Sequence, residues 1–271
     1  MTAYNYNNRE EKRREEKRSL RALLKKSEFL RKGVNAVRSF RKNLRYLTLW
    51  KQYIHIFKSK HGLEVGGPSE IFSPVYSKCA SCDGVNFSAD TVWWQKGSTD
   101  KYKYHSHILG NMYIADAVDM SCLNDASYDF VMSSNNLEHI ANPIKALKEF
   151  VRVLKYGGCV IVLVPMKDRT FDHRREYTSF EHILEDYRND MQETDLTHLP
   201  EILELHDYEL DPPAGGPENF RKRSMLNYEN RCLHHHVFCE DSLRKIFEYL
   251  NLEVIGLDEC GGNYRIIGRK G

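Results

Sequence analysis

The stretch LEVGGPSEIF, residues 63–72, places two adjacent glycines between an apolar segment and a proline. Gly66 and Gly67 let the backbone approach a ligand closely, and Pro68 and Ser69 suit the first turn of a helix with free N–H groups. Glu64 supplies an acidic acceptor just before this turn. A dinucleotide loop needs three spaced glycines, so the turn favours a ligand with a cationic amine. The alternative is a turn that serves only strand-to-helix packing.

Two histidines are candidates for a catalytic base. His139 follows a predicted strand at 128–134, and His173 lies in the loop after a predicted strand at 159–165. Loops at the carboxyl ends of parallel strands carry the substrate in open α/β folds, and imidazole accepts protons near neutral pH. The alternatives are local packing of a helix-start histidine for His139 and a solvated charged loop for His173.

The loop that contains His173 also gathers cations, which favours an anionic acceptor such as a carboxylate, a phosphate or a nucleotide-linked sugar. Farther on, LHHHVF at 233–238 brings two histidines to one face if it is extended. These histidines are assigned to the substrate pocket and no metal site is expected, because no zinc-type spacing is present; a divalent ion held with carboxylates from 166–210 is the alternative. The candidate substrate-binding residues are Lys167, Arg169, Arg174, Arg175, His234 and His236.

The elements that must position these residues alternate between strands and helices. Asn142 and Pro143 predict the start of a helix, and Gly157 with Gly158 predict its end. A second helix is predicted at 241–250, before a hairpin that turns at 260–262. This order indicates a doubly wound, Rossmann-like sheet of seven strands that ends in an antiparallel hairpin. The other strands are predicted at 62–66, 84–88, 112–117, 128–134 and 159–165.

Charge divides the chain into two parts. Residues 9–60 hold 18 Lys or Arg and 5 Asp or Glu, whereas the whole chain of 271 residues has a net charge of only +2. Residues 1–57 are therefore predicted to be a basic helical arm, with helices at 9–32 and 34–57. Residues 58–271 are predicted to be the catalytic domain, with a substrate-side insertion at 166–236. Such an arm either contacts an anionic partner or packs on its own acidic domain.

Composition excludes several classes of protein. No run of about 18 apolar residues predicts a membrane span, and the polar N-terminus does not resemble a secretion signal. The seven cysteines are scattered and odd in number, which is typical of reduced thiols. The single CxxC pair, Cys79 and Cys82, has no second pair at zinc spacing, so we interpret it as loop or core.

The order of motifs over residues 60–165 resembles the class I S-adenosylmethionine-dependent methyltransferases, in particular their type 11 group. The block YDFVMSSNNLEHIANPIKALKEFVRVLKYGGCVIVLVP, residues 128–165, carries most of this resemblance. The family grips the ribose with an acidic residue after its second strand, where this sequence has Asn86, with Asp90 as a substitute. Asp116 matches the acidic residue that accepts from the adenine amino group. The cofactor-binding positions implied by the resemblance are Glu64, Gly66, Gly67, Pro68, Ser69, Asn86, Phe87, Ser88, Asp116, Ala117, Asn135, Asn136 and Leu137.

The resemblance implies a methyltransferase that uses S-adenosyl-L-methionine and methylates an oxygen of a small anionic or sugar-type acceptor. Similar members are associated with glycan biosynthesis, where a sugar hydroxyl or a uronate carboxylate of a surface polysaccharide is the acceptor. The alternatives are an RNA methyltransferase that uses the basic arm and a non-catalytic relative. We expect a cytoplasmic enzyme without a nucleic-acid partner, because its main domain is acidic. Contact of the arm with the inner membrane surface and pairing into a homodimer stay open.

Overall fold

The computed structural model describes residue 34, residues 41–89 and residues 100–271, and the chain divides into two compact units, 1–48 and 49–271. The helix predicted at 9–32 lies outside the described residues. Residues 41–50 are helical, a turn follows at 51–53, and α3 covers Ile54–Phe57, so the predicted helix at 34–57 is interrupted. Among the described residues, no helix has the length and apolar character needed to cross a membrane.

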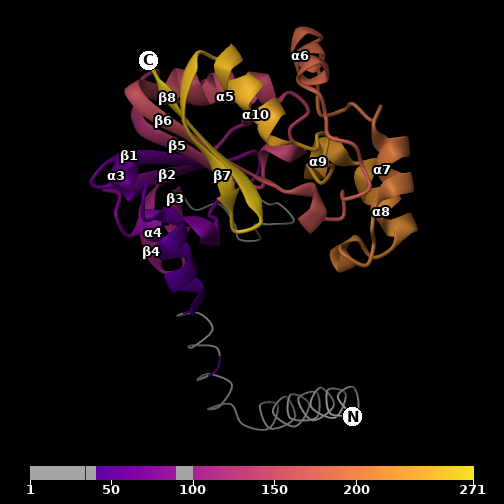
Figure 1. The fold of residues 1–271 in the computed structure, drawn as a ribbon, viewed down its shortest axis with the longest axis horizontal. Helices are drawn as coiled ribbons and strands as arrows, with labels where there is room; N and C mark the ends of the chain where they lie inside the picture. The colour runs from indigo at the N-terminus through magenta and orange to yellow at the C-terminus, as the bar shows by residue number, and fades with distance from the viewer. Residues whose placement is uncertain (1–33, 35–40, 90–99) are drawn as a thin grey trace, which may run out of the picture. The chain divides into compact units, whose positions relative to one another are not determined.

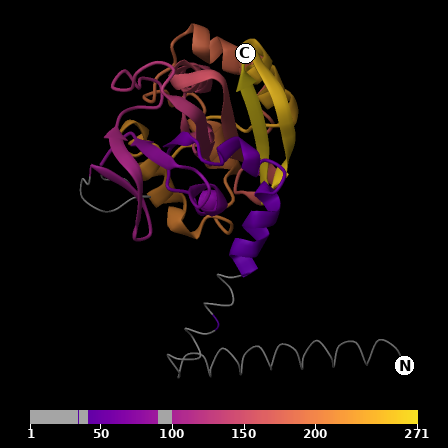
Figure 2. The ribbon, with the colours of Figure 1, turned by 90° about the vertical axis from the view of Figure 1, so that its left-hand side faces the viewer.

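The second unit is built on an eight-stranded sheet with the order β3-β4-β2-β1-β5-β6-β8-β7 (Figure 1). The neighbours from β4 to β6 pair in parallel, and β8 pairs antiparallel with both β6 and β7. Figure 2 shows the β7–β8 hairpin in yellow at one edge of the sheet. The strands are β1 His61–Val65, β2 Ser81–Asn86, β3 Lys101–Tyr104, β4 His107–Ile114, β5 Tyr128–Ser134, β6 Leu154–Pro165, β7 Leu252–Cys260 and β8 Asn263–Lys270.

The predicted doubly wound sheet and terminal hairpin are confirmed, but the count of seven strands is wrong. The additional strand, β3, pairs antiparallel with β4 through a short hairpin whose turn contains His105 with a φ of 53°. The predicted end of the helix after Asn142 is also wrong. The helix α5 covers Pro143–Val153. The next residue, Leu154, has an extended backbone and is the first residue of β6. Gly157, with a φ of 74°, therefore lies inside β6, beside an irregularity in its pairing with β5.

Alternating side chains on the central strands supply both faces of the sheet. Val131 on β5 joins the main core with Leu147 of α5 and Phe247 of α10, which covers Glu240–Tyr249. On the other face Phe130 meets Phe57 of α3 with ring centroids 5.0 Å apart. Since successive side chains on a strand point to opposite faces, the uninterrupted apolar run of β6 is explained by burial on both sides.

Asn142 caps α5 as predicted, because its side chain accepts a hydrogen bond from the Lys145 backbone N–H at 3.1 Å.

Trp50 fixes the start of the second unit, since its indole donates to the Ile71 carbonyl at 2.7 Å and its ring is fully buried. In the helix predicted at 34–57, the apolar side chains of Leu44 and Leu47 are 55% and 46% exposed.

The insertion between β6 and α10 is largely helical. Its first long helix, α6, packs against α5 and α10, and Figure 1 shows α7, α8 and α9 together on one side of the sheet. These helices have a small core of their own that includes Leu199, Ile202 and Phe220. The longer helices of the insertion are α6 Phe180–Arg188, α7 Leu199–Leu205 and α8 Pro217–Ser224, and the short ones are η3 Lys167–Arg169, η4 Pro212–Ala214 and α9 Asn227–Asn230.

Candidate active site

A cavity of about 420 Å³ opens at the carboxyl ends of β1, β2, β4 and β5, where open α/β folds bind their ligands. Its volume is in the range of small-molecule sites. The insertion closes the side opposite the strands. Of the predicted cofactor-binding residues, those that line the cavity are Gly66, Gly67, Pro68, Asn86, Phe87, Asp116, Ala117, Asn135 and Asn136.

The Gly66–Gly67 turn leaves no room for a side chain. Gly66 has a φ of 83°, and a Cβ there would lie 2.6 Å from the Asn136 side chain. A Cβ on Gly67 would lie 2.2 Å from the Glu64 carboxyl carbon and 2.3 Å from the Tyr102 hydroxyl. Bare backbone therefore faces the cavity between two neighbouring strand ends, as the sequence predicted for a close ligand contact.

Glu64 lies beside this turn, but it does not line the cavity. Its carboxylate is fully buried and accepts hydrogen bonds from the Tyr76 hydroxyl at 2.5 Å, the Tyr102 hydroxyl at 2.6 Å and the Ser69 backbone N–H at 3.0 Å. Burial raises the pKa of Glu64 to about 7, although these hydrogen bonds oppose the shift. The described contacts thus make Glu64 an anchor of the turn, and its direct contact with the ligand stays a prediction. Ser69, Ser88 and Leu137 likewise are not among the residues that line the cavity.

The raised pKa of Glu64 predicts a specific dependence of stability on pH. Between its ordinary value of 4.5 and about 7, the folded protein holds a proton that the unfolded chain has lost. This proton therefore stabilises the folded state fully below pH 4.5. As pH rises to about 7 the stabilisation is lost, and the free energy of unfolding falls by about 3 kcal/mol. Urea denaturation at about pH 5 and about pH 8 should therefore show a smaller fall in stability for Glu64→Gln than for the wild type. Equal falls would contradict the assignment.

Asn86 and Asp116 end two neighbouring strands and face the same cavity. The Asn86 amide donates to the Gly67 carbonyl at 3.0 Å, so it ties the end of β2 to the glycine turn. Asp116 follows β4, and its carboxylate accepts from the Arg231 guanidinium at 2.6 Å. The acidic position that the resemblance assigns to adenine is therefore bridged to the insertion.

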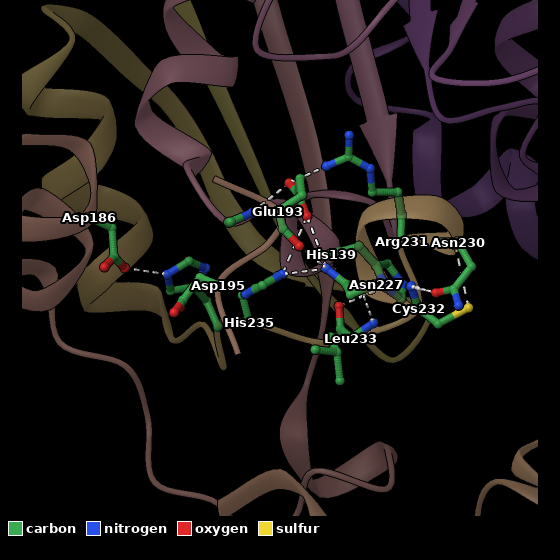
Figure 3. A network of polar contacts seen from close by, with 12 residues as sticks. His139, Asp186, Glu193, Asp195, Asn227, Asn230, Arg231, Cys232, Leu233 and His235 are labelled. Carbon is green, nitrogen blue, oxygen red and sulfur yellow. Dashed lines mark hydrogen bonds and ion pairs between the residues drawn. The ribbon is translucent and has the colours of Figure 1, made fainter. Parts of the chain in front are cut away.

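Arg231 is the centre of a polar network that sequence reasoning missed (Figure 3). Besides Asp116, its guanidinium contacts the Glu193 carboxylate at 3.0 Å and lies over the Phe87 ring, 5.3 Å from the centroid. Glu193 in turn accepts from the Ala141 backbone N–H at 2.9 Å. Arg231 has a φ of 52°. One arginine thus joins the wall of the cavity at β4 to two segments of the insertion.

The cavity also holds a pair of histidines. The rings of His139 and His234 meet edge to face with centroids 4.5 Å apart. His139 Nδ1 donates to the Leu233 carbonyl at 3.1 Å, which selects the tautomer whose Nε2 carries no proton. Burial holds the pKa of His139 well below its usual value, so this imidazole is neutral at physiological pH.

His234 has a carboxylate partner, unlike His139. His234 Nδ1 donates a hydrogen bond to the Asp172 carboxylate. The same carboxylate forms an ion pair with the Arg175 guanidinium at 3.2 Å. Burial opposes the charged imidazole, but the attraction of Asp172 outweighs it and raises the pKa of His234. Next to the two rings, the buried Glu138 has its pKa raised to about 7 by burial, and its Oε2 has no hydrogen-bond partner in the described part of the chain.

The structure does not bring the other predicted catalytic and substrate residues to this cavity. His173 pairs with Asp207 at 2.9 Å and is absent from the cavity lining among the described residues. Arg175 is buried and donates hydrogen bonds to Asp172 and Glu201. His236 is buried and hydrogen-bonded to Asp186. Lys167, Arg169 and Arg174 also lie outside the lining.

The cavity cations are instead Arg223 and Arg231, which the sequence gave no reason to single out. Arg223 contacts the Asp211 carboxylate at 3.5 Å. The Nε atoms of both arginines are buried without a hydrogen-bond partner in the ranges that the structure covers. Both residues follow the cation-rich loop by some fifty positions, so only the folding of the insertion makes them neighbours of the strand ends. Other lining residues outside the sequence prediction are Thr170, Phe171, Glu193, Asp211 and Cys232.

Among the described residues, two groups of side chains have donor atoms close enough to hold a metal ion. The first is Glu138, His139 and His234 in the cavity, and the second is His182, Asp186 and His236 outside its lining. In each group the donor atoms lie within 4.8 Å of one another.

Comparison with known proteins agrees with this geometry. A family model described as a methyltransferase domain matches residues 63–162. Ajmaline N-methyltransferase from Rauvolfia serpentina is 30% identical over 82 residues, which are 30% of this chain and 27% of that protein. The match thus spans about a quarter of the curated relative.

Solved structures of methyltransferases are also similar over most of the chain. A SAM-dependent methyltransferase from Aquifex aeolicus is 12% identical, with a TM-score of 0.45 over 83% of this chain and 89% of that one. A methyltransferase from Haloferax volcanii, solved with the Trm112 activator, is 14% identical, with a TM-score of 0.47 over 88% and 94%. The match of residues 63–162 to a methyltransferase domain supports S-adenosyl-L-methionine as the cofactor.

Proposed function

We propose that this protein transfers the methyl group of S-adenosyl-L-methionine to an oxygen of a small anionic or sugar-type acceptor. One observation carries the proposal: the glycine turn of the cofactor end and the His139–His234 pair line the same cavity. Methyl transfer from a sulfonium is an in-line displacement by a nucleophile. The protein therefore has to align the acceptor oxygen with the methyl carbon and exclude water, and positioning supplies much of the rate.

The acceptor side of the cavity supports a proton-bearing nucleophile. A hydroxyl must lose its proton as it attacks, and a neutral imidazole at His139 can accept it. The neighbouring Asp172–His234 pair has the arrangement that orients imidazoles in hydrolytic triads, with a carboxylate on Nδ1. A carboxylate acceptor would need no base, and the histidines would then only orient it.

Two guanidinium donors in the cavity support an anionic acceptor, against the four carboxylates that also line it, Asp116, Glu138, Glu193 and Asp211. Arg223 and Arg231 each keep a buried Nε–H without a partner in the described chain, and guanidinium donors suit carboxylates and phosphates. A uronate or a phosphate-linked sugar has these groups. On the resemblance given above, we place the reaction in surface-polysaccharide biosynthesis.

Methyl transfer from radiolabelled S-adenosyl-L-methionine to a panel of acceptors tests the proposal. The panel contains uronic acids, nucleotide-linked sugars, neutral sugars and primary amines. We expect label in an anionic sugar, with release of S-adenosylhomocysteine in equal amount. Calorimetry with S-adenosylhomocysteine is the companion measurement, and absence of binding would refute a catalytic role.

N-methylation is the second candidate, because the Glu138 carboxyl has a buried Oε2 without a partner among the described residues. A carboxylate at that point would attract a cationic amine. The curated relative is named an N-methyltransferase. Label in the amines of the panel and none in the sugars would select this alternative.

Asp116 is predicted to contribute one strong contact to the cofactor. Its carboxylate is the acceptor for the adenine amino group, and the Asp116→Ala variant is expected to bind S-adenosylhomocysteine about tenfold more weakly, which corresponds to about 1.4 kcal/mol. Asp119→Ala is a matched control, because Asp119 is exposed and does not line the cavity. Isothermal titration calorimetry measures both. Equal affinities in the two variants would contradict the assignment.

A further inference from the structure

Three histidines and one aspartate converge at the base of the insertion, away from the cavity. His182 and Asp186 stand one helical turn apart on α6, so their side chains share a face. His198 precedes α7, and His236 lies in the extended segment before α10. None of the four is among the residues that line the cavity in the described chain.

The donor atoms of these side chains point at one another. His182 Nε2 lies 3.0 Å from His198 Nε2 and 3.4 Å from Asp186 Oδ2. His236 Nε2 lies 2.9 Å from the same oxygen of Asp186, a contact that Figure 3 marks with a dashed line at Asp186. The donor atoms of His182, Asp186 and His236 all lie within 4.8 Å of one another.

Protons occupy only some of these contacts. His182 and His198 share one proton between their Nε2 atoms, so one imidazole donates to the other. His236 is almost fully buried, and its Nδ1 has no hydrogen-bond partner among the described residues. The Nε2 atoms of His182 and His236 both face one carboxylate oxygen of Asp186.

A divalent cation fits between His182, Asp186 and His236. Tetrahedral zinc with nitrogen and oxygen ligands at about 2.0–2.1 Å sets its ligand atoms about 3.3 Å apart, and the contacts of the two histidines with Asp186 are close to that spacing. Imidazole nitrogens with one carboxylate oxygen are a donor set that Zn²⁺ accepts readily.

We propose that His182, Asp186 and His236 bind one Zn²⁺ ion as a structural site. The ion joins α6 to the segment before α10, and these two segments are separate in sequence. It thereby fixes the extended segment that also carries His234 to the rest of the domain. This proposal revises the sequence-based expectation of no metal, and it does not depend on the methyltransferase reaction.

Metal analysis of the full-length protein tests the proposal. The wild type, dialysed against metal-free buffer and reloaded with ZnCl₂, is expected to retain about one zinc per chain by inductively coupled plasma mass spectrometry. His182→Asn changes the most exposed of the three ligands, so its fold is expected to persist. Loss of a residue that only supports a ligand typically weakens metal binding by roughly 10- to 100-fold. Loss of a direct ligand should weaken zinc binding by more than that. Cobalt loading gives a second readout, because a tetrahedral Co²⁺ site absorbs visible light strongly.

Two comparison variants make the result specific. His107→Asn removes an exposed histidine of β4 and should leave zinc content and the cobalt spectrum unchanged. His234→Asn alters the other metal-capable group, in the cavity, and should also retain one zinc. The proposal is overturned if the reloaded wild type holds no zinc, or if His182→Asn and Asp186→Asn retain it. It is also overturned if His234→Asn loses the ion, since the metal would then belong to the cavity.

Discussion

Replacing Gly67 with alanine is expected to weaken the binding of S-adenosylhomocysteine at least about 100-fold. The new Cβ would lie 2.2 Å from the Glu64 carboxyl carbon and 2.3 Å from the Tyr102 hydroxyl. Both side chains are fully buried and hydrogen-bonded to each other, so neither has space to move away. The turn must therefore move into the space that the cofactor uses, and interiors packed at crystal density do not absorb such a shift. Calorimetric titration measures the loss.

Gly271→Ala is the matched control for this variant, because a Cβ at Gly271 meets no atom within 4 Å. It should bind as the wild type does. Circular dichroism establishes that Gly67→Ala keeps its secondary structure, which separates a lost site from an unfolded chain. Binding of Gly67→Ala within about threefold of the wild type would mean that the cofactor does not rest on this turn.

Replacing His139 with asparagine is expected to lower kcat by about 10²–10⁴-fold, the usual contribution of a general base. The affinity for S-adenosylhomocysteine should stay within about twofold, because the base acts on the acceptor. The pKa of His139 is held well below its usual value, so the base stays neutral in mildly acidic solution. Protonation of His139 should therefore not lower the wild-type rate at about pH 6, and a change of rate near pH 7 would come from Glu138, whose pKa is raised to about 7. Initial rates from about pH 6 to about pH 8, measured with the acceptor found by the panel, test the prediction.

His105→Asn is a control of the same chemistry, because His105 is exposed in the turn between β3 and β4. His173→Asn provides the comparison with the other predicted base. A large loss in His173→Asn, with none in His139→Asn, would move the base to the loop beside Asp207. Full activity in a variant that lacks both histidines would exclude histidine base catalysis and favour a carboxylate acceptor.

The sequence by itself determined most of the doubly wound sheet and the edge where a ligand would bind. The glycines at 66–67, the cap at Asn142 and the apolar run of β6 are local signals, because each depends on backbone conformation or on burial of neighbouring residues. Residues at the ends of parallel strands meet at one edge of the sheet whatever the details of packing. For that reason Asn86, Asp116 and Asn135 were placed correctly around the cavity.

Only the tertiary structure decided how the insertion completes the site. Arg231 meets Asp116 across 115 positions, and His234 meets Asp172 across 62. Such pairs leave no trace in local periodicity, since the contact is set by how α6 to α9 pack on the sheet. The same packing left the cations of the expected loop outside the cavity lining, although Thr170 and Phe171 of that loop line it. It also buried His236 beside Asp186. Long-range burial assigns these side chains their partners, because an enclosed charge needs a counter-charge wherever the fold provides one.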